Sequence, residues 1–274
     1  MTFTSLPVLA AAEWGGEFEG ALDDINALFD FPPVIELSIA GLDLSINRTI
    51  LIAWFMTLVV AVLFGLAFRK PEIVPGKLQA ACEAIVDFVR NGIALEIIGQ
   101  RGLKFVPLLT TMLVTIFLLN LAKITPFIMM PPTSRMAWPF FFALLAWVIY
   151  LVVGFREHGV LGYLKQNAFP EGVPKVAYVL ITPIELLTVI VLRPFTLAIR
   201  LFANMVAGHI LVVLTLVAIH VFLHPAQGFG IGIGVFALAA SPVVFAFELL
   251  IISLQAYIFT LLTAVYIDSS LEAH

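Results

Sequence analysis

Polar and ionisable side chains interrupt the most apolar part of this chain, residues 176–268. A charge at the centre of a bilayer costs about 2.5 to 3.5 kcal/mol on insertion scales, so charged residues in such segments mark functional sites. A guanidinium keeps its proton and can attract a carboxylate, whereas an imidazole or a carboxyl group can pass a proton on. The candidates lie in two successive apolar arms, as follows: Arg200, Asn204 and His209, then Glu248 and Gln255.

The spacing of these residues predicts which of them share a helical face. Arg200 and Asn204 are four residues apart and lie on one face, whereas His209 is nine residues from Arg200, about 180° round the helix. Glu248 and Gln255 are seven residues apart, which brings them to the same face within about 20°. The first arm therefore carries two polar faces and the second arm carries one.

A purely structural role competes with a functional one for each buried charge. Glu248 and His209 would tie two helices together if they paired, and Arg193 would be satisfied by Glu185 or by reaching the membrane surface. We prefer this structural role for Arg193 and Glu185. Arg200 is different, because it lies in the middle of an apolar arm and a bare guanidinium there is too costly. Its partner must be an acid on the second arm or on another subunit.

Composition identifies the kind of protein that must position these residues. Hydrophobic residues make up 62% of the 274 residues and charged residues 12%, against about 45 to 50% and 25% in a typical soluble domain. This is a membrane protein. A net charge of −4, without a phosphate-binding loop or an HExxH motif, argues against nucleic acid and nucleotide chemistry. Cys82 is the single cysteine and has no metal-site spacing, so we expect no metal and no cofactor.

The hydropathy pattern predicts an all-α, polytopic membrane protein with about five crossings. Residues 1–47 hold eight acids and no Lys or Arg, so we expect an acidic extracytoplasmic segment, followed by a membrane domain over 48–274. Cations cluster after the first span, which places that loop inside, the N-terminus outside and the C-terminus inside. The predicted elements are spans at about 49–68, 105–130 and 138–155, an amphipathic inner-surface helix at about 77–99, and a helical hairpin at 176–268.

The hairpin is too long to stand upright in a membrane. Its first arm has about 47 residues, or roughly 70 Å of helix, against a hydrocarbon core of about 30 Å. The arm must be broken or steeply tilted, and Pro183 and Pro194 are positions where it can kink. We expect the turn at 224–228, with three glycines behind it: Gly230, Gly232 and Gly234.

The stretch RPFTLAIRLFANMVAGH, residues 193–209, resembles subunit a of the F-type ATP synthase membrane sector. This stretch is highly specific, and further similar blocks cover most of the chain from the first inner loop onward. They are PGKLQ at 75–79, LNLAKITP at 119–126 and LQAYIFTLLTAVYI at 254–267. The acidic first 45 residues carry none of the resemblance.

The resemblance implies a stationary proton channel with two half-channels beside a rotating ring of c subunits. Arg200 occupies the position of the family's essential arginine and would act as barrier and counter-charge. The family's polar channel positions correspond to Asn204, His209, Glu248 and Gln255. Some relatives carry the acid and the imidazole in exchanged places, which still leaves one acid and one base. Lys123 departs from the family, and we expect its side chain to reach the outer surface.

The same resemblance implies partners and a location. The partners are the c ring, b-type stator subunits and the soluble F1 ATPase, which carries the ATP chemistry, so this chain is expected to be non-catalytic. The lipid bilayer and protons complete the set. Sodium stays open as the coupling ion, because the ion-binding carboxylate lies on the ring. The basic inner loop and the lack of a transit peptide favour a bacterial plasma (inner) membrane and a multi-pass protein.

Two other classes of function compete with the channel. A secondary transporter would bind an anionic substrate at Arg200, but such proteins usually show internal repeats, and the second and third spans do not echo the hairpin. An intramembrane hydrolase would need Ser253 and His209, but Ser253 lies off the row of Glu248 and Gln255 and has no nucleophile motif around it.

Overall fold

A computed structural model describes most of the chain and confirms the predicted all-α membrane fold. Its described residues are 33–35, 38–39, 42–43, 46–125, 131–168, 178–223 and 231–272. Five helical stretches are long and apolar enough to cross a membrane: Arg48–Ala67, Lys77–Leu121, Ala137–His158, Leu180–Phe222 and Ile231–Leu271. Which end faces outside stays a prediction, as does the location of residues 1–47.

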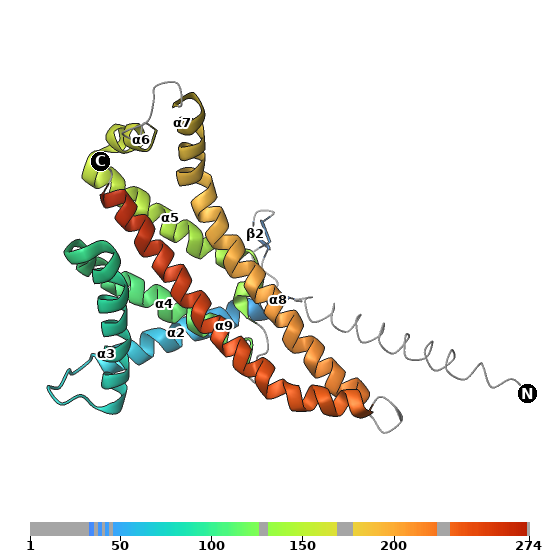
Figure 1. The fold of residues 1–274 in the computed structure, drawn as a ribbon. Coiled ribbons are helices and arrows are strands. Elements are labelled where there is room, and N and C mark those ends of the chain that lie inside the picture. Colours follow the sequence, from blue (N-terminus) through green and yellow to red (C-terminus); the bar gives the residue numbers. More distant parts are fainter. Residues whose placement is uncertain are drawn as a thin grey trace, which may run out of the picture. The chain divides into compact units, whose positions relative to one another are not determined.

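The chain divides into two compact units. The larger unit takes in residues 52–206 and 249–274, and the smaller unit takes in residues 1–51 and 207–248. The two longest helices, α8 (Arg193–Phe222) and α9 (Ile231–Leu271), each contribute one end to each unit. Figure 1 shows these two helices as the longest in the molecule.

Short strands precede the first span. β1 (Pro33–Ile35) pairs with β4 (Ile46–Asn47), and β2 (Ser38–Ile39) pairs with β3 (Leu42–Asp43), both antiparallel. Apolar residues at 35, 37 and 39 alternate with polar ones, a pattern typical of a strand. The acidic residues of positions 1–32 lie outside the described part of the chain.

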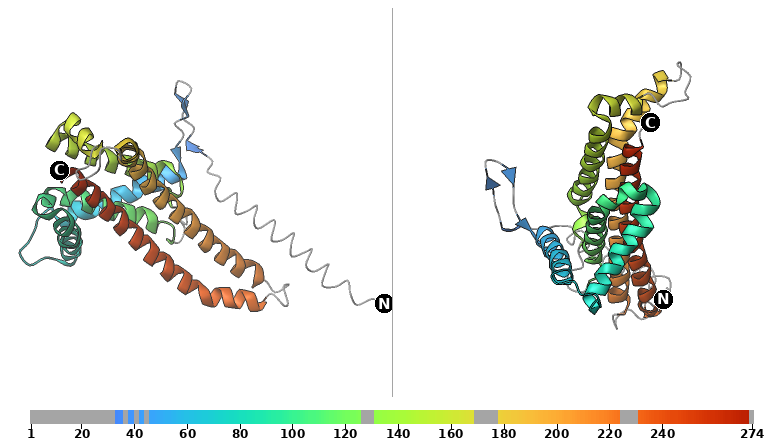
Figure 2. Two further views of the ribbon diagram at one scale, coloured as in Figure 1. Left: turned by 45° about the horizontal axis from the view of Figure 1, so that its top comes forward. Right: turned by 90° about the vertical axis from the view of Figure 1, so that its left-hand side faces the viewer.

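The described residues of the larger unit form helices and the turns between them. In chain order they are most of α2 (Arg48–Ala67), α3 (Lys77–Val89), η1 (Arg90–Ile98), η2 (Gly99–Phe105), α4 (Val106–Leu121), η3 (Pro132–Ser134), α5 (Ala137–His158), α6 (Val160–Ala168), α7 (Tyr178–Leu187), η4 (Thr188–Leu192), the start of α8 and the end of α9. Figure 2 shows them from two further directions.

Two element boundaries differ from the sequence prediction. The second span was expected to run to about residue 130, but α4 ends at Leu121 and a turn follows, while residues 126–130 lie outside the described chain. The amphipathic helix predicted over 77–99 is α-helical only to Val89, after which η1 continues as a wider π-helix. Hydropathy locates an apolar helix but does not register a change in its winding.

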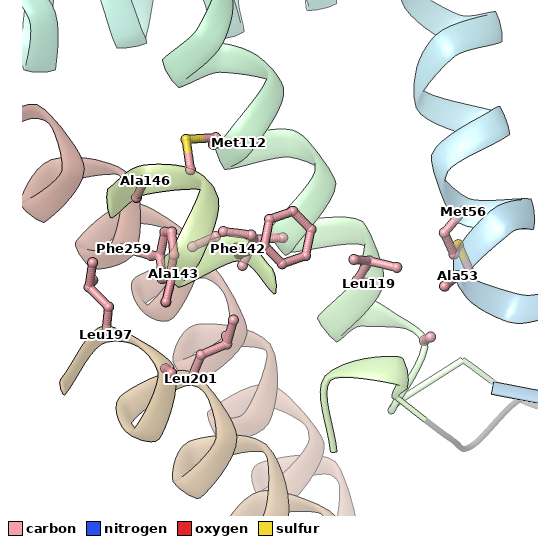
Figure 3. Packing of buried hydrophobic residues seen from close by; sticks show 14 residues of the cluster. Ala53, Met56, Met112, Leu119, Phe142, Ala143, Ala146, Leu197, Leu201 and Phe259 are labelled. Atoms are coloured by element: carbon pink, nitrogen blue, oxygen red, sulfur yellow. The ribbon is translucent and has the colours of Figure 1, made fainter. Parts of the chain in front are cut away.

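Two buried clusters hold the larger unit together. In the first, Ala143 and Ala146 of α5 leave room for Phe259 of α9 and Leu197 of α8, and all four side chains are almost fully buried (Figure 3). Small residues on one helix allow the neighbouring helices to approach closely, which is how membrane helices gain packing energy. The second cluster includes Tyr150, Tyr163 and Ile267.

Candidate functional site

Arg200 is presented on the exposed side of α8. Leu197, Ala198 and Leu201 form the buried stripe of this helix within the larger unit. At 100° per residue, Arg200 lies about 110° from the middle of that stripe. Its side chain is exposed, and no salt bridge joins it to any described residue. The two partners expected from the sequence, an acid on the second arm and an acid on another subunit, both stay predictions.

The exposed side of α8 continues along the helix as a row of residues spaced by three and four. Arg200 and Ala203 belong to the larger unit and Ala207 and Leu211 to the smaller, and all four are exposed. Asn204 lies on the edge of this row and is half-buried. Two of the exposed residues are alanines, so the backbone of α8 is accessible to a neighbouring helix.

Gln255 lies on the inward side of α9 in the larger unit. Its side chain is buried, as are those of Ile252, Ala256 and Phe259, which share its face. Its Nε2 atom has no hydrogen-bond partner among the described residues. A buried amide donor usually finds an acceptor, so Gln255 is suited to bind water or a passing polar group.

Gly234 holds the two arms of the hairpin in close contact within the smaller unit. A methyl group added at Gly234 would lie 2.8 Å from both the backbone carbonyl carbon of Phe222 and the backbone nitrogen of Leu223. Only glycine permits such a contact of helix backbones. We had placed Gly232 and Gly234 behind the turn. Both lie in the first turn of α9, after the expected turn, and Gly234 allows the close packing of the two arms.

Counted from this contact, His209 and Glu248 are expected at about the same level. His209 precedes Leu223 by 14 residues, and Glu248 follows Gly234 by 14 residues, so each lies about 21 Å along its helix from the contact. Both belong to the smaller unit, and both side chains are buried, His209 at 5% exposure and Glu248 at 0%. Glu248 is also within about 40° of Gly234 round α9, on the side that approaches α8.

Lys123 does not reach the surface, which corrects our expectation. Its side chain is 1% exposed, at the end of α4, and its backbone N–H donates to the carbonyl of Asn120. Beside it, the Thr133 hydroxyl donates to Oδ1 of Asn120 over 2.7 Å, and both of these side chains are buried. The prediction assumed a span that continues to about residue 130, whereas Lys123 lies in the turn that follows the end of α4 at Leu121.

We had expected Arg193 to pair with Glu185 or to reach the membrane surface. In the structure its described contacts are different. Its guanidinium lies 5.1 Å from the centre of the Tyr266 ring, and its Nη2 donates to the Ser269 hydroxyl at 3.4 Å. A cation over an aromatic face is stabilised without a carboxylate, so the charge is accommodated at the end of α9.

Ser253 lacks the arrangement of a nucleophile. It is exposed on α9, and its hydroxyl donates to the backbone carbonyl of Leu249 over 2.8 Å. A serine nucleophile needs its hydroxyl hydrogen-bonded to a base instead. The hydrolase alternative therefore loses its nucleophile.

The family model and the curated relatives that match this chain are named after the same subunit. The family model described as ATP synthase A chain matches residues 50–268. A protein named ATP synthase subunit a from Rhodococcus erythropolis is 40% identical over 270 residues, covering 98% of this chain and 94% of the relative. Its namesakes from Parafrankia sp. and Frankia alni are 40% and 37% identical, covering 97% and 93% of this chain and 88% and 86% of the relatives.

Proposed function

Because the chain belongs to the ATP synthase A chain family, we propose that it is the stationary subunit that conducts protons between the membrane faces and the carboxylates of a rotating c ring. The observation that carries this proposal is Arg200, a cation exposed on a long apolar helix. In a bilayer such a cation needs a carboxylate from outside the chain. A ring of carboxylates that passes α8 supplies one at every step.

Arg200 acts as barrier and counter-charge. Its guanidinium stays protonated at any working pH, so it attracts an ionised ring carboxylate but cannot relay a proton itself. A carboxylate therefore arrives at Arg200 without its proton and leaves to collect one from a half-channel. The membrane potential contributes about 2.3 kcal/mol per charge for each 100 mV.

His209 and Glu248 form one proton-transfer pair of a half-channel. Their support is the equal count of residues from the Gly234 contact and the burial of both side chains in one unit. A buried acid and a buried imidazole at one depth can exchange a proton. By the predicted orientation this pair belongs to the outer half-channel.

Asn204 and Gln255 serve the path as polar groups that do not titrate. Asn204 is half-buried beside the exposed row of α8. The Nε2 atom of the buried Gln255 has no hydrogen-bond partner among the described residues and can donate to water or a carboxylate. Amides of this kind hold water or orient a carboxylate without taking up the proton.

The chain itself is non-catalytic in this function, and ATP is made on partner subunits. The c ring, b-type stator subunits and the soluble F1 ATPase are the proposed partners, with the protein crossing a bacterial plasma membrane several times. A secondary transporter is disfavoured, because the chain belongs to the ATP synthase A chain family.

The decisive experiment replaces Arg200 in the intact complex. Arg200→Ala should abolish ATP synthesis driven by a proton gradient in inverted vesicles, while ATP hydrolysis by the soluble sector persists. A mutant that still makes ATP would refute the role of Arg200. Ser253→Ala, on the exposed face of the other arm, serves as the matched control and should synthesise normally. Pumping measured with and without sodium identifies the ion.

A further inference from the structure

The entry to α8 contains a backbone carbonyl that the helix cannot satisfy. Between α7 and α8 the chain forms the π-helical turn η4, in which the N–H of Arg193 donates to the carbonyl of Thr188, five residues earlier. By the same pattern the carbonyl of Val189 should receive the N–H of residue 194. That residue is Pro194, which has no N–H.

A tyrosine from another helix satisfies this carbonyl. The hydroxyl of Tyr150, on α5, donates to the Val189 carbonyl over 2.5 Å. Tyr150 is 0% exposed and Val189 is 2% exposed, so water does not reach the carbonyl. A buried carbonyl without a partner is expensive, and the Tyr150 hydroxyl therefore holds the π-helical turn in place.

The same tyrosine also contacts the end of α9. The rings of Tyr150 and Tyr266 meet edge to face at 5.7 Å between centres, and Tyr266 carries the Arg193 guanidinium on its face. Arg193 is the first residue of α8 and adds its bond to Ser269. Three helices are thus joined at one point, two turns before Arg200.

We propose that Tyr150 is a positioning residue that fixes the rotation of α8 and so directs Arg200 toward the ring. The reason is geometric: a π-turn adds about one residue to the helix, so a change to α-helical winding alters the rotation between its two sides by about 100°. All the contacts that fix this turn lie in the larger unit, together with Arg200. The effect on Arg200 and the ring rests on the proposed function. The role of Tyr150 in holding η4 does not.

Tyr150→Phe tests the structural part, since it removes one hydroxyl and keeps the ring. Hydrogen exchange of the backbone amides of 188–197, measured by mass spectrometry on the intact complex, should become about 5- to 100-fold faster. Tyr163→Phe is the matched control, because Tyr163 is almost equally buried and its hydroxyl is hydrogen-bonded to the Ser270 hydroxyl at 3.1 Å. Unchanged exchange in Tyr150→Phe, or equal acceleration in both variants, would overturn the proposal.

Pro194→Ala tests the cause. Alanine restores an N–H at the position that a π-turn uses for Val189, so the Tyr150→Phe effect should shrink severalfold in the double variant. If the two substitutions act additively, the missing N–H is not the reason for the tyrosine, and the proposal fails. If the complex with Tyr150→Phe alone fails to assemble, the proposal requires that the complex with both substitutions does assemble. Failure of both would overturn the proposal.

A separate measurement tests whether Tyr150 positions Arg200. Single cysteines at Ala207 and Val206 report the rotation of α8 by cross-linking to the c ring, and Tyr150→Phe should shift yield from position 207 toward 206, with a severalfold loss of ATP synthesis. Faster exchange without such a shift would show a hydrogen bond that does not position Arg200. Failure of the proposed function is distinguishable, because Arg200→Ala would then be harmless while the exchange result stands.

Discussion

Leu223 and Gly234 meet backbone to backbone, with only 2.8 Å from the Leu223 nitrogen to the place that a Gly234 side chain would fill. This contact fixes how far the second half of α8 and the first half of α9 are offset along each other. Because His209 and Glu248 each lie 14 residues from it, the offset also decides whether the acid and the imidazole face each other.

Gly234→Ala should therefore impair proton conduction from a distance. The added methyl group meets backbone atoms, which cannot rotate away, so we expect a destabilisation of about 1 to 3 kcal/mol. Gly232→Ala is the control, because nothing lies within 4 Å of its Cβ position, and in a helix this change stabilises by up to about 1 kcal/mol. Thermal inactivation and ATP-driven pumping measure both variants. Equal behaviour of the two would show that the contact is not limiting.

The exchange of His209 and Glu248 tests whether the two act as a pair. His209→Glu and Glu248→His alone should each reduce proton flux strongly, since each leaves two like groups in one buried place. The double variant restores one acid and one base and should recover flux that corresponds to a coupling of about 0.5 to 3 kcal/mol. Passive flux through membranes stripped of the soluble sector is the measurement. A double variant no better than the singles means that the residues are not coupled.

Arg200→Lys tests whether a positive charge alone is enough at position 200, or whether the planar and permanently protonated guanidinium is needed. Lysine keeps the positive charge but lacks the planar fork, and its ammonium group can lose a proton when it is desolvated. We expect ATP synthesis to fail and the stripped membranes to leak protons faster than those of Arg200→Ala. Full synthesis by Arg200→Lys would show that a point charge is enough.

The sequence predicts the helices well and their fine structure poorly. Apolar runs identify the five membrane-capable helices, because length and hydropathy are properties of a local segment. The cost of burying charge singles out Arg200 in the same local way. By contrast, the turn η4 depends on Pro194 together with Tyr150, a residue 44 positions away. The burial of Lys123 likewise depends on where α4 ends, which hydropathy does not define.

The exposed row of α8 makes a prediction about the partner's surface. Arg200, Ala207 and Leu211 fall within about 40° of one another round the helix, whereas Val206 is turned about 120° away from the middle of these three. A ring that passes Arg200 must also pass the two residues that follow it on this face.

Cysteines at Ala207 and Leu211 should therefore form disulfides with cysteines on the outer helix of the c ring, and one at Val206 should not. Both substitution sites in the row are exposed, and Ala207→Cys adds little bulk. The native Cys82 is buried on α3 and is not expected to react. A Cys82→Ser background excludes disulfides formed by this residue. Cross-linking at Val206 with silence at the other two positions would place the ring on a different face of α8, and Arg200 would then need another explanation for its exposure.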